Sequence, residues 1–229
     1  MHEEKYYLRI TCMKHFLILL IFIFSMSAAE AQDMATFFIN MPDSYLPQLE
    51  DAWRKDLVDL YQSGKPAVLE NTMTGSSTLQ KLTSDYLLLQ TTERSTMEIR
   101  FLPLINNTLI ACVITTVYAP VADSRVAFYS NEWHPLPSSG LLPPVNTEWF
   151  IKDNTIHDDE DLQETLSYID MELIHYRLTP DELILEATFT TPHYLSSEER
   201  MKVKTFFKDT SKVYHWKAGR FEETSSSEK

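Results

Sequence analysis

Glycine is scarce in this sequence of 229 residues. Only four glycines occur, at positions 64, 75, 140 and 219, and each lies outside the predicted strands and helices, where turns and helix ends favour glycine. Loops that hold nucleotide phosphates need several glycines close together, because the backbone must approach the phosphate closely. The sequence therefore excludes a phosphate-binding loop of this type.

Cysteine is scarcer still, since Cys12 and Cys112 are the only two. Cys12 precedes the predicted export signal at residues 13–31, so the mature protein keeps one thiol and no disulfide. Cys112 lies within the most apolar predicted strand. A reactive thiolate needs exposure and positive neighbours, so we expect Cys112 to be a buried, unreactive side chain.

Basic residues are also in short supply. The chain has 20 Lys and Arg against 33 Asp and Glu, which gives a formal net charge of -13. A phosphate backbone or an anionic membrane surface would be repelled by this charge. We therefore expect no nucleic acid among its partners.

Long hydrophobic runs are absent apart from one short segment near the N-terminus. Met13 and Lys14 begin a positive region, residues 15–24 are apolar, and residues 29–31 read Ala-Glu-Ala, which is the pattern of a cleaved signal peptide. About ten apolar residues are too few to cross a bilayer, which takes about 20. We predict that residues 1–31 are a signal peptide, with translation starting at Met13, and that the protein is exported to the periplasm or secreted, with no stable membrane anchor after cleavage.

Four consecutive strands form the centre of the predicted fold. They cover residues 86–92, 95–103, 108–118 and 124–133, joined by short polar turns that favour an antiparallel meander. In the second strand, apolar residues at 97, 99 and 101 alternate with polar ones at 96, 98 and 100, so we expect one of its faces in water. Residues 109–118 are almost wholly apolar and predict a central strand covered on both faces. Shorter polar strands between residues 65 and 84 extend the sheet at its edge.

An amphipathic helix is predicted before this meander, over residues 42–64. Its apolar residues recur at spacings of three and four, and Gly64 ends it. The opposite face is charged and is typical of solvated surface. Arg54, Asp56 and Asp59 on this face are candidate partner-binding residues.

The composition changes after residue 133. Residues 134–148 are rich in proline, which cannot continue a sheet, and predict a stiff linker between residues 32–133 and a second region at 149–222. That region is predicted to hold a hairpin at 171–191, a helix at 196–207 and a last strand, followed by a disordered tail at 223–229. The predicted fold class is therefore α+β: an N-terminal helix on an antiparallel meander, then a smaller β-plus-helix region. Short similarities between the two regions leave a duplicated module open as an alternative.

Several segments together resemble a known family. The runs KDLVDLYQSG, ENTMTGSSTLQKLTSDYLLLQ, STMEIRFLPL, LIACVITTVYAPVADSRVAFYSNEW and VYHWKAGRF resemble an uncharacterised family of exported proteins from Bacteroidales, a domain of unknown function. The resemblance covers almost all of the mature chain. It implies a Gram-negative exported protein of α+β type with no assigned activity. The family commonly shows Arg-Leu-Asp-like residues where this chain has residues 54–56.

No pattern of residues predicts a catalytic centre or a cofactor. The chain has no Gly-x-Ser-x-Gly turn for a nucleophile and no paired His or Cys at zinc spacing. Residues 157–161 hold the one cluster of metal-ligand types, but they lack the alternating spacing and central glycine of a calcium loop. We expect a solvated acidic turn there and keep four residues as candidate metal ligands: His157, Asp158, Asp159 and Asp161. Trp149 is a further candidate for partner binding.

Two functional classes remain open. The first is a non-catalytic envelope protein that binds an unidentified protein or small molecule through its sheet or the Trp149 region. The second is a hydrolase of envelope or glycan substrates that uses dispersed carboxylates, whose separation in space the sequence does not give. A deep cleft that brings together two or more of a small set would favour the enzyme: Asp56, Asp59, His157, Asp158, Glu172 and His175. A shallow apolar surface would favour binding.

Overall fold

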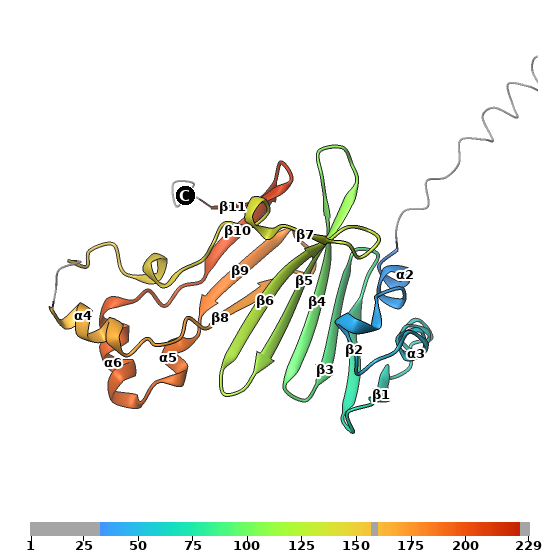
Figure 1. The fold of residues 1–229 in the computed structure, drawn as a ribbon, viewed down its shortest axis with the longest axis horizontal. Coiled ribbons are helices and arrows are strands. Elements are labelled where there is room, and N and C mark those ends of the chain that lie inside the picture. Colours follow the sequence, from blue (N-terminus) through green and yellow to red (C-terminus); the bar gives the residue numbers. More distant parts are fainter. Residues whose placement is uncertain (1–32, 157–159, 225–229) are drawn as a thin grey trace, which may run out of the picture. The chain divides into compact units, whose positions relative to one another are not determined.

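The computed structural model describes residues 33–156 and 160–224, and the predicted signal peptide lies outside them. Residues 34–224 lie within one compact unit. In the described part of the chain, two antiparallel sheets form, one of seven strands in the order β1-β2-β3-β4-β5-β6-β7 and one of four in the order β11-β10-β9-β8 (Figure 1). The predicted α+β class is confirmed, whereas a duplicated module stays a prediction.

The larger sheet is a meander in which each strand pairs with the next along the chain. Its strands are β1 (Val68–Glu70), β2 (Ser76–Leu82), β3 (Tyr86–Thr92), β4 (Ser95–Pro103), β5 (Leu109–Tyr118), β6 (Ala122–Tyr129) and β7 (Pro135–Leu136). The four predicted central strands correspond to β3–β6. The prediction that residues 109–118 are covered on both faces is confirmed for 110–114, which are all buried, and wrong for 115, 117 and 118, which are exposed.

Two helices cover one face of this sheet, on the side of β2–β4 (Figure 1). They are α2 (Met34–Ile39), which no sequence pattern had predicted, and α3 (Asp51–Gln62). The prediction of one continuous helix over residues 42–64 is wrong, because its first part forms a single 3-10 turn, η1 (Asp43–Tyr45). Pro47 lacks a backbone N–H and disfavours helical geometry at the residue before it, so the chain stays irregular until residue 51.

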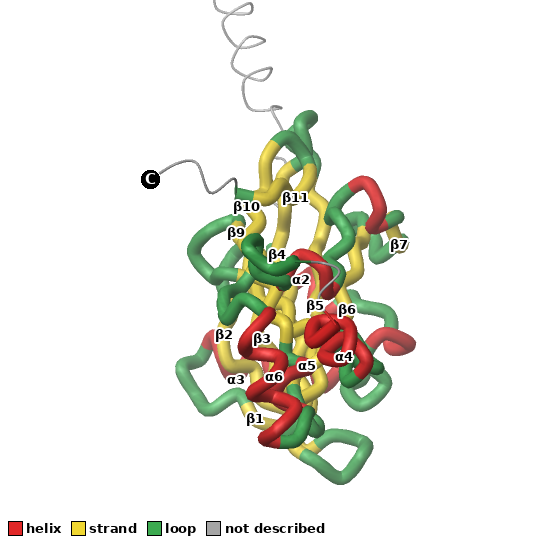
Figure 2. The backbone as a smooth tube through the Cα atoms, turned by 90° about the vertical axis from the view of Figure 1, so that its left-hand side faces the viewer, coloured by secondary structure: helices red, strands yellow, loops and turns green. Residues whose placement is uncertain are grey.

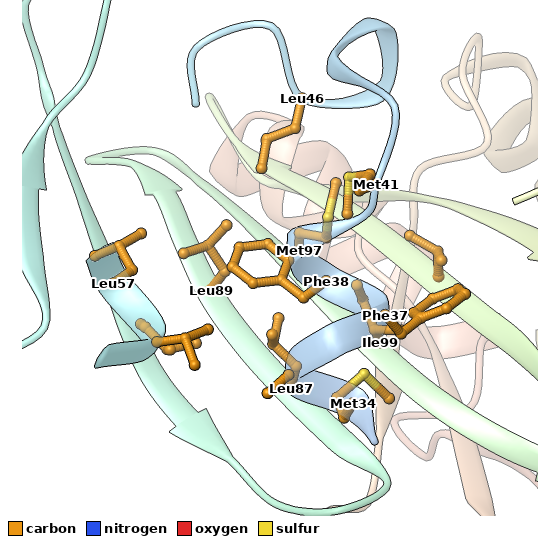
Figure 3. Close-up of a cluster of buried hydrophobic side chains, with 14 of the residues drawn as sticks. Met34, Phe37, Phe38, Met41, Leu46, Leu57, Leu87, Leu89, Met97 and Ile99 are labelled. Atoms are coloured by element: carbon orange, nitrogen blue, oxygen red, sulfur yellow. The ribbon is translucent and has the colours of Figure 1, made fainter. Parts of the chain in front are cut away.

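The first core lies between these helices and the sheet (Figure 3). Phe37 and Phe38 of α2 and Leu57 of α3 pack on residues of β3 and β4 that point to the helical side. Those residues alternate along the strands and are Leu87, Leu89, Met97, Ile99 and Phe101. The expected inward face of β4 is therefore confirmed.

The smaller sheet consists of β8 (Ile174–Leu178), β9 (Ile184–Phe189), β10 (Lys212–Lys217) and β11 (Arg220–Glu223). The predicted last strand is divided into a hairpin, because Ala218 and Gly219 both adopt positive φ, as in a tight two-residue turn. Three helices accompany this sheet, α4 (Glu160–Ser167), α5 (Thr191–Tyr194) and α6 (Ser197–Phe206), with α5 and α6 together at its end (Figure 2). The predicted cap of α6 is confirmed, since the side chains and backbones of Ser196 and Glu199 form a capping box.

Two predictions at the borders of this region are wrong. Residues 134–148 do continue the larger sheet, because β7 pairs with β6 and its Pro135 lies in an edge strand, where a missing N–H is tolerated. The segment also holds the 3-10 helix η2 (Ser138–Gly140), and Leu141, Leu142 and Val145 pack on the core between the sheets. Glu223 does not begin a disordered tail, since it lies in β11 and pairs with Lys212 at 3.1 Å.

The second core joins the two sheets. Side chains of β5 and β6 such as Ile114 and Phe128 pack against Leu185 of β9, Tyr214 of β10 and Phe221 of β11. The smaller sheet therefore covers the face of β4 that the alternation at 96–100 placed in water. That prediction is wrong for residues 98 and 100, because Glu98 and Arg100 are 5% and 4% exposed.

Polar side chains of the larger sheet accept hydrogen bonds from the outer edge of β8. The backbone N–H groups of its residues 174, 176 and 178 point away from β9 and donate to side chains of β4 and β6. The acceptors are Asp123 Oδ1 at 3.3 Å, Ser124 Oγ at 3.0 Å and Glu98 Oε2 at 3.1 Å. An edge strand with unpaired N–H groups is open to association with other chains, so these side chains also protect β8.

Glu98 is the most buried carboxyl group in this arrangement. Burial raises its pKa above the ordinary value of 4.5, although the hydrogen bonds from the Leu178 N–H and the Tyr86 hydroxyl oppose the rise. Burial also raises the pKa of the Cys112 thiol, and the charge of Glu98 adds to this effect. Cys112 is fully buried and outside any disulfide, which confirms its expected burial.

Within the described residues, no helix combines the length and apolar character that a membrane crossing would need.

The raised pKa of Glu98 predicts a specific pH dependence of stability. The folded protein holds the proton more tightly than the unfolded chain, so ionisation lowers the free energy of unfolding as the pH rises from 4.5 towards the raised pKa. Glu98→Gln keeps an acceptor for Leu178 but cannot ionise. The free energy of unfolding of the wild type minus that of Glu98→Gln should therefore fall as the pH rises above 4.5, measured by urea denaturation.

Glu93→Gln, in the exposed turn between β3 and β4, is the matched control for this chemical change. If the free energy of unfolding of the wild type minus that of Glu98→Gln instead rose with pH, Glu98 would not be a buried carboxyl group with a raised pKa.

Candidate functional site

The three predicted partner-binding residues of α3 do not form one site. Arg54 is 1% exposed, and its guanidinium donates to the backbone carbonyls of Ile39, Met41 and Leu49 and to Asp43 Oδ1, the last at 2.9 Å. It thereby ties the segment between α2 and α3 to α3. Asp56 and Asp59 are exposed on the outer side of the same helix.

The predicted metal ligands are only partly described. His157, Asp158 and Asp159 lie outside the described residues, and Asp161 is exposed in the first turn of α4. Within residues 33–156 and 160–224, no group of three or more Asp, Glu, His or Cys side chains is arranged to hold a metal ion.

Of the described members of the predicted hydrolase set, Asp56 and Asp59 share α3, whereas Glu172 lies just before β8 and His175 within it. Glu172 accepts hydrogen bonds from the backbone N–H of Thr147, at 3.0 Å, and from its hydroxyl, so it holds the start of the 3-10 helix η3 (Thr147–Phe150). His175 lies on β8, where burial lowers the pKa of its imidazole and the charge of Arg177 adds to this shift. Four surface pockets of about 220 to 320 Å³ in the described part of the chain are lined by neither of these residues, nor by Asp56 or Asp59.

Trp149 is half-buried beside β10 and β11. Its indole N–H donates to Glu223 Oε1 at 2.7 Å, and the ammonium groups of Lys208 and Lys212 lie 5.0 and 4.9 Å from its ring. Cations at this distance from an indole face are attracted by the ring. Trp149 therefore connects η3 to the C-terminal hairpin.

A pocket of about 250 Å³ opens on the helical side of the larger sheet. We call it the aromatic pocket. Its walls are Tyr45, Tyr129 and Trp133, its polar lining is Ser44, Thr115 and Arg125, and its floor on the strands is Met97, Val113 and Ala127.

The position of this pocket follows from the alternation along β5 and β6. Val113 points into the helix-side core, so Thr115, two residues further on, lies on the same face. Arg125 of β6 is the cross-strand partner of Thr115. Both are exposed, whereas Val113 is buried, so α2 and α3 leave this end of the face uncovered and the pocket forms at their border.

The aromatic walls are fixed by ring contacts. Tyr45 and Tyr129 meet edge to face at 5.0 Å, and Tyr129 lies 5.2 Å from Trp133 between ring centroids. Phe37 stacks on Trp133 at 4.1 Å, and the Trp133 indole N–H donates to the Phe37 carbonyl at 3.0 Å. Burial raises the pKa of Tyr129, with a smaller contribution from Tyr45, so its phenol is neutral at neutral pH.

Trp133 has an unusual backbone conformation. It closes the loop between β6 and β7 with φ of 62°, a region that bulky residues rarely adopt, and a hairpin loop of this kind favours glycine there. The 130–134 loop is held by two backbone bonds, from Ser130 N to His134 O and from Trp133 N to Ser130 O. The chain therefore places a tryptophan where the backbone favours glycine, and the side chain's stacking and hydrogen bond with Phe37 oppose the strain.

The lining of the aromatic pocket determines what it can do. Its side chains offer hydroxyl groups, one guanidinium and three aromatic rings, and none of the lining residues is a carboxylate, histidine or cysteine. A serine or threonine hydroxyl needs an adjacent general base to act as a nucleophile, and the lining offers no carboxylate or imidazole beside Ser44 or Thr115. The pocket is therefore suited to binding. It was not predicted from the sequence, and the one signal that pointed to it was a tryptophan at the end of a strand, in a turn where glycine would be usual.

Comparison with known proteins places the chain among uncharacterised ones. The family model described as "Protein of unknown function (DUF3256)" matches residues 26–221. A solved structure, "Structure of a domain of an uncharacterized protein from Porphyromonas gingivalis W83", is similar with a TM-score of 0.75 and 28% sequence identity, over 82% of this chain and 98% of that one. None of the curated proteins matches the chain.

The strained position of Trp133 predicts an order of stability among its variants. Trp133→Ala removes the contacts with Phe37 and should lower the free energy of unfolding by about 3 to 5 kcal/mol. Trp133→Gly loses the same contacts but relieves the positive φ, so it should be less destabilised than Trp133→Ala by about 1 kcal/mol. Chemical denaturation of both variants measures this. A glycine variant as stable as the wild type would show that the side chain contributes nothing.

Proposed function

Because this chain belongs to the DUF3256 family of proteins of unknown function, we propose a function from its own geometry: it is an exported envelope protein that binds a saccharide ring in its aromatic pocket without transforming it. The aromatic pocket is the observation that carries this proposal. It combines ring-shaped apolar walls with hydroxyl and guanidinium groups on one uncovered face of the sheet.

The chemistry of a sugar matches this lining. The C–H face of a sugar ring packs on aromatic side chains, and its hydroxyl groups need hydrogen-bonding partners around the rim. Tyr45 and Tyr129 provide such rings, and Ser44, Thr115 and Arg125 provide the polar groups. A cavity of about 250 Å³ is below the range of pockets for drug-sized ligands, about 300 to 1,000 Å³, so it suits a single ring.

The hydrolase alternative receives less support. Glycoside hydrolysis needs two carboxyl groups on either side of the bond. The aromatic pocket has none in its lining, and among the described candidates Glu172 is engaged by Thr147. A binding role without catalysis is therefore the function that this site supports best.

Export is the second element of the proposal. The pattern at residues 13–31 is that of a cleaved signal peptide, and the family match begins at residue 26, after its apolar segment. We expect N-terminal sequencing of the protein recovered from a producing Gram-negative cell to find Gln32 first. A chain that begins intact at residue 1 or 13 would contradict export by this route.

Substitution of Tyr45 tests the binding site. Tyr45 is 37% exposed and its ring forms a wall of the aromatic pocket, so Tyr45→Ala should weaken saccharide binding about tenfold without unfolding the protein. Titration of the purified protein with N-acetylglucosamine, N-acetylmuramic acid and glucuronic acid, followed by ligand-detected NMR, measures this. Tyr118→Ala is the matched control, since Tyr118 is an exposed tyrosine on β5 outside the pocket.

Arg125→Gln separates acidic from neutral sugars. Arg125 is the one charged side chain in the pocket lining, so its loss should weaken binding of the two acidic sugars and leave N-acetylglucosamine unchanged. The proposal fails if none of the three sugars binds saturably, or if Tyr118→Ala weakens binding as much as Tyr45→Ala does.

A further inference from the structure

A second pocket lies beside α6, next to the end of β9 and the residues that precede β10. The charge of its lining is opposite in sign to the net charge of the whole chain. Its volume is about 220 Å³, and we call it the basic pocket. Its lining holds four cations and a single acid, Asp209, together with His193; the cations are Lys152, Arg200, Lys204 and Lys208. In a chain with 33 acidic and 20 basic residues, such a grouping reverses the local sign of the charge.

Two of these cations are held in place by neutral acceptors. Lys152 Nζ donates to the carbonyls of Lys204 and Thr205, both at 2.8 Å, at the C-terminal end of α6. The Arg200 guanidinium donates to the carbonyls of Pro192, His193 and Leu195, at 2.9 to 3.2 Å. Within the described residues neither side chain takes part in an ion pair. Their geometry is therefore fixed while their charge is not neutralised.

The two other lysines are available to a ligand in different ways. The side chain of Lys204 is exposed on α6 and makes no hydrogen bond or ion pair within the described part of the chain. Lys208 Nζ pairs with Asp153 Oδ1 at 2.8 Å, but the Asp153 side chain is 92% exposed, so water screens this pair strongly. A ligand with a negative head group would meet both ammonium groups.

The base of the pocket is apolar. It is formed by Phe189, Val203 and Phe207, and the first and last of these stack at 5.5 Å. Two backbone hydrogen bonds join the segments that carry Lys152 and Lys208, from Lys152 N to Phe206 O and from Lys208 N to Phe150 O. Apolar and cationic side chains in one pocket favour a ligand with both an anionic and an apolar part.

We propose that the basic pocket binds a small molecule with a phosphate or carboxylate head and a short apolar body. The head lies against Lys204, Lys208 and the fixed charges of Lys152 and Arg200, and the body lies on Phe189 and Phe207. The ligand enters as a single molecule, because a net charge of -13 opposes approach of the whole protein to an anionic membrane. This site lies on residues 152–209, apart from the residues of the aromatic pocket.

Calorimetric titration with simple probes tests the proposal. The purified protein is titrated with inorganic phosphate, hexyl phosphate and the neutral hexyl glucoside. We expect hexyl phosphate to bind one to one and about tenfold more tightly than inorganic phosphate, as burial of about two methylene groups would give. Hexyl glucoside should bind more weakly than hexyl phosphate, because it lacks the charge.

Charge reversal on α6 locates the site. Lys204→Glu should weaken hexyl phosphate binding by about tenfold, since an attractive charge becomes a repulsive one. Lys55→Glu makes the same change at an exposed position of α3, outside the basic pocket, and should leave the affinity unchanged.

The following results would overturn the proposal. Equal affinity of Lys204→Glu and wild type would place the ligand elsewhere, and equal affinity for hexyl glucoside would remove the role of charge. Hexyl phosphate that shows no saturable binding, beside strong binding to vesicles of anionic phospholipid, would show that these lysines serve a membrane surface instead.

Discussion

The structure depends on hydrogen bonds that cross from the side chains of one sheet to the backbone of another. Glu98, Asp123 and Ser124 of the larger sheet accept the outward N–H groups of β8, the edge strand of the smaller sheet. Edge strands otherwise expose such groups to water or to other chains. Because these acceptors lie on β4 and β6, the smaller sheet is held at one position over the larger one, and burial of Glu98 is the cost of that position.

The two sides of the larger sheet are consequently covered by different elements. Helices α2 and α3 pack on β2–β4 from one side, and the smaller sheet packs on the other side. Neither covers the helix-side face of β5 and β6 around Thr115 and Arg125, and there the loop that carries Trp133 builds the aromatic pocket. The basic pocket arises separately, where α5 and α6 meet the segment that begins at Phe150. Each candidate site therefore lies at the border of a covering element.

Individual residues explain where sequence reasoning succeeded. Residues 86–118 showed strand-forming composition with short polar turns, and the structure places β3, β4 and β5 there with nearly the same limits. The same reasoning failed for Glu98 and Arg100, whose polarity indicated a wet face, because only contact with Leu178, Tyr86, Asp85 and Pro180 makes their burial favourable. Arg54 was expected at the surface for the same reason, although its guanidinium donates to the carbonyls of Ile39 and Met41, which precede the predicted helix, and to that of Leu49 within it.

The sequence by itself determined the elements that rest on local chemistry. The hairpins of the meander, the capping box of α6 and the burial of Cys112 follow from turn residues, caps and apolar runs that act between near neighbours. Only the tertiary structure decided which polar residues are buried and which pockets exist. Those properties depend on residues far apart in the chain, such as Phe37 with Trp133 and Lys152 with Lys204, and no local pattern encodes their distance.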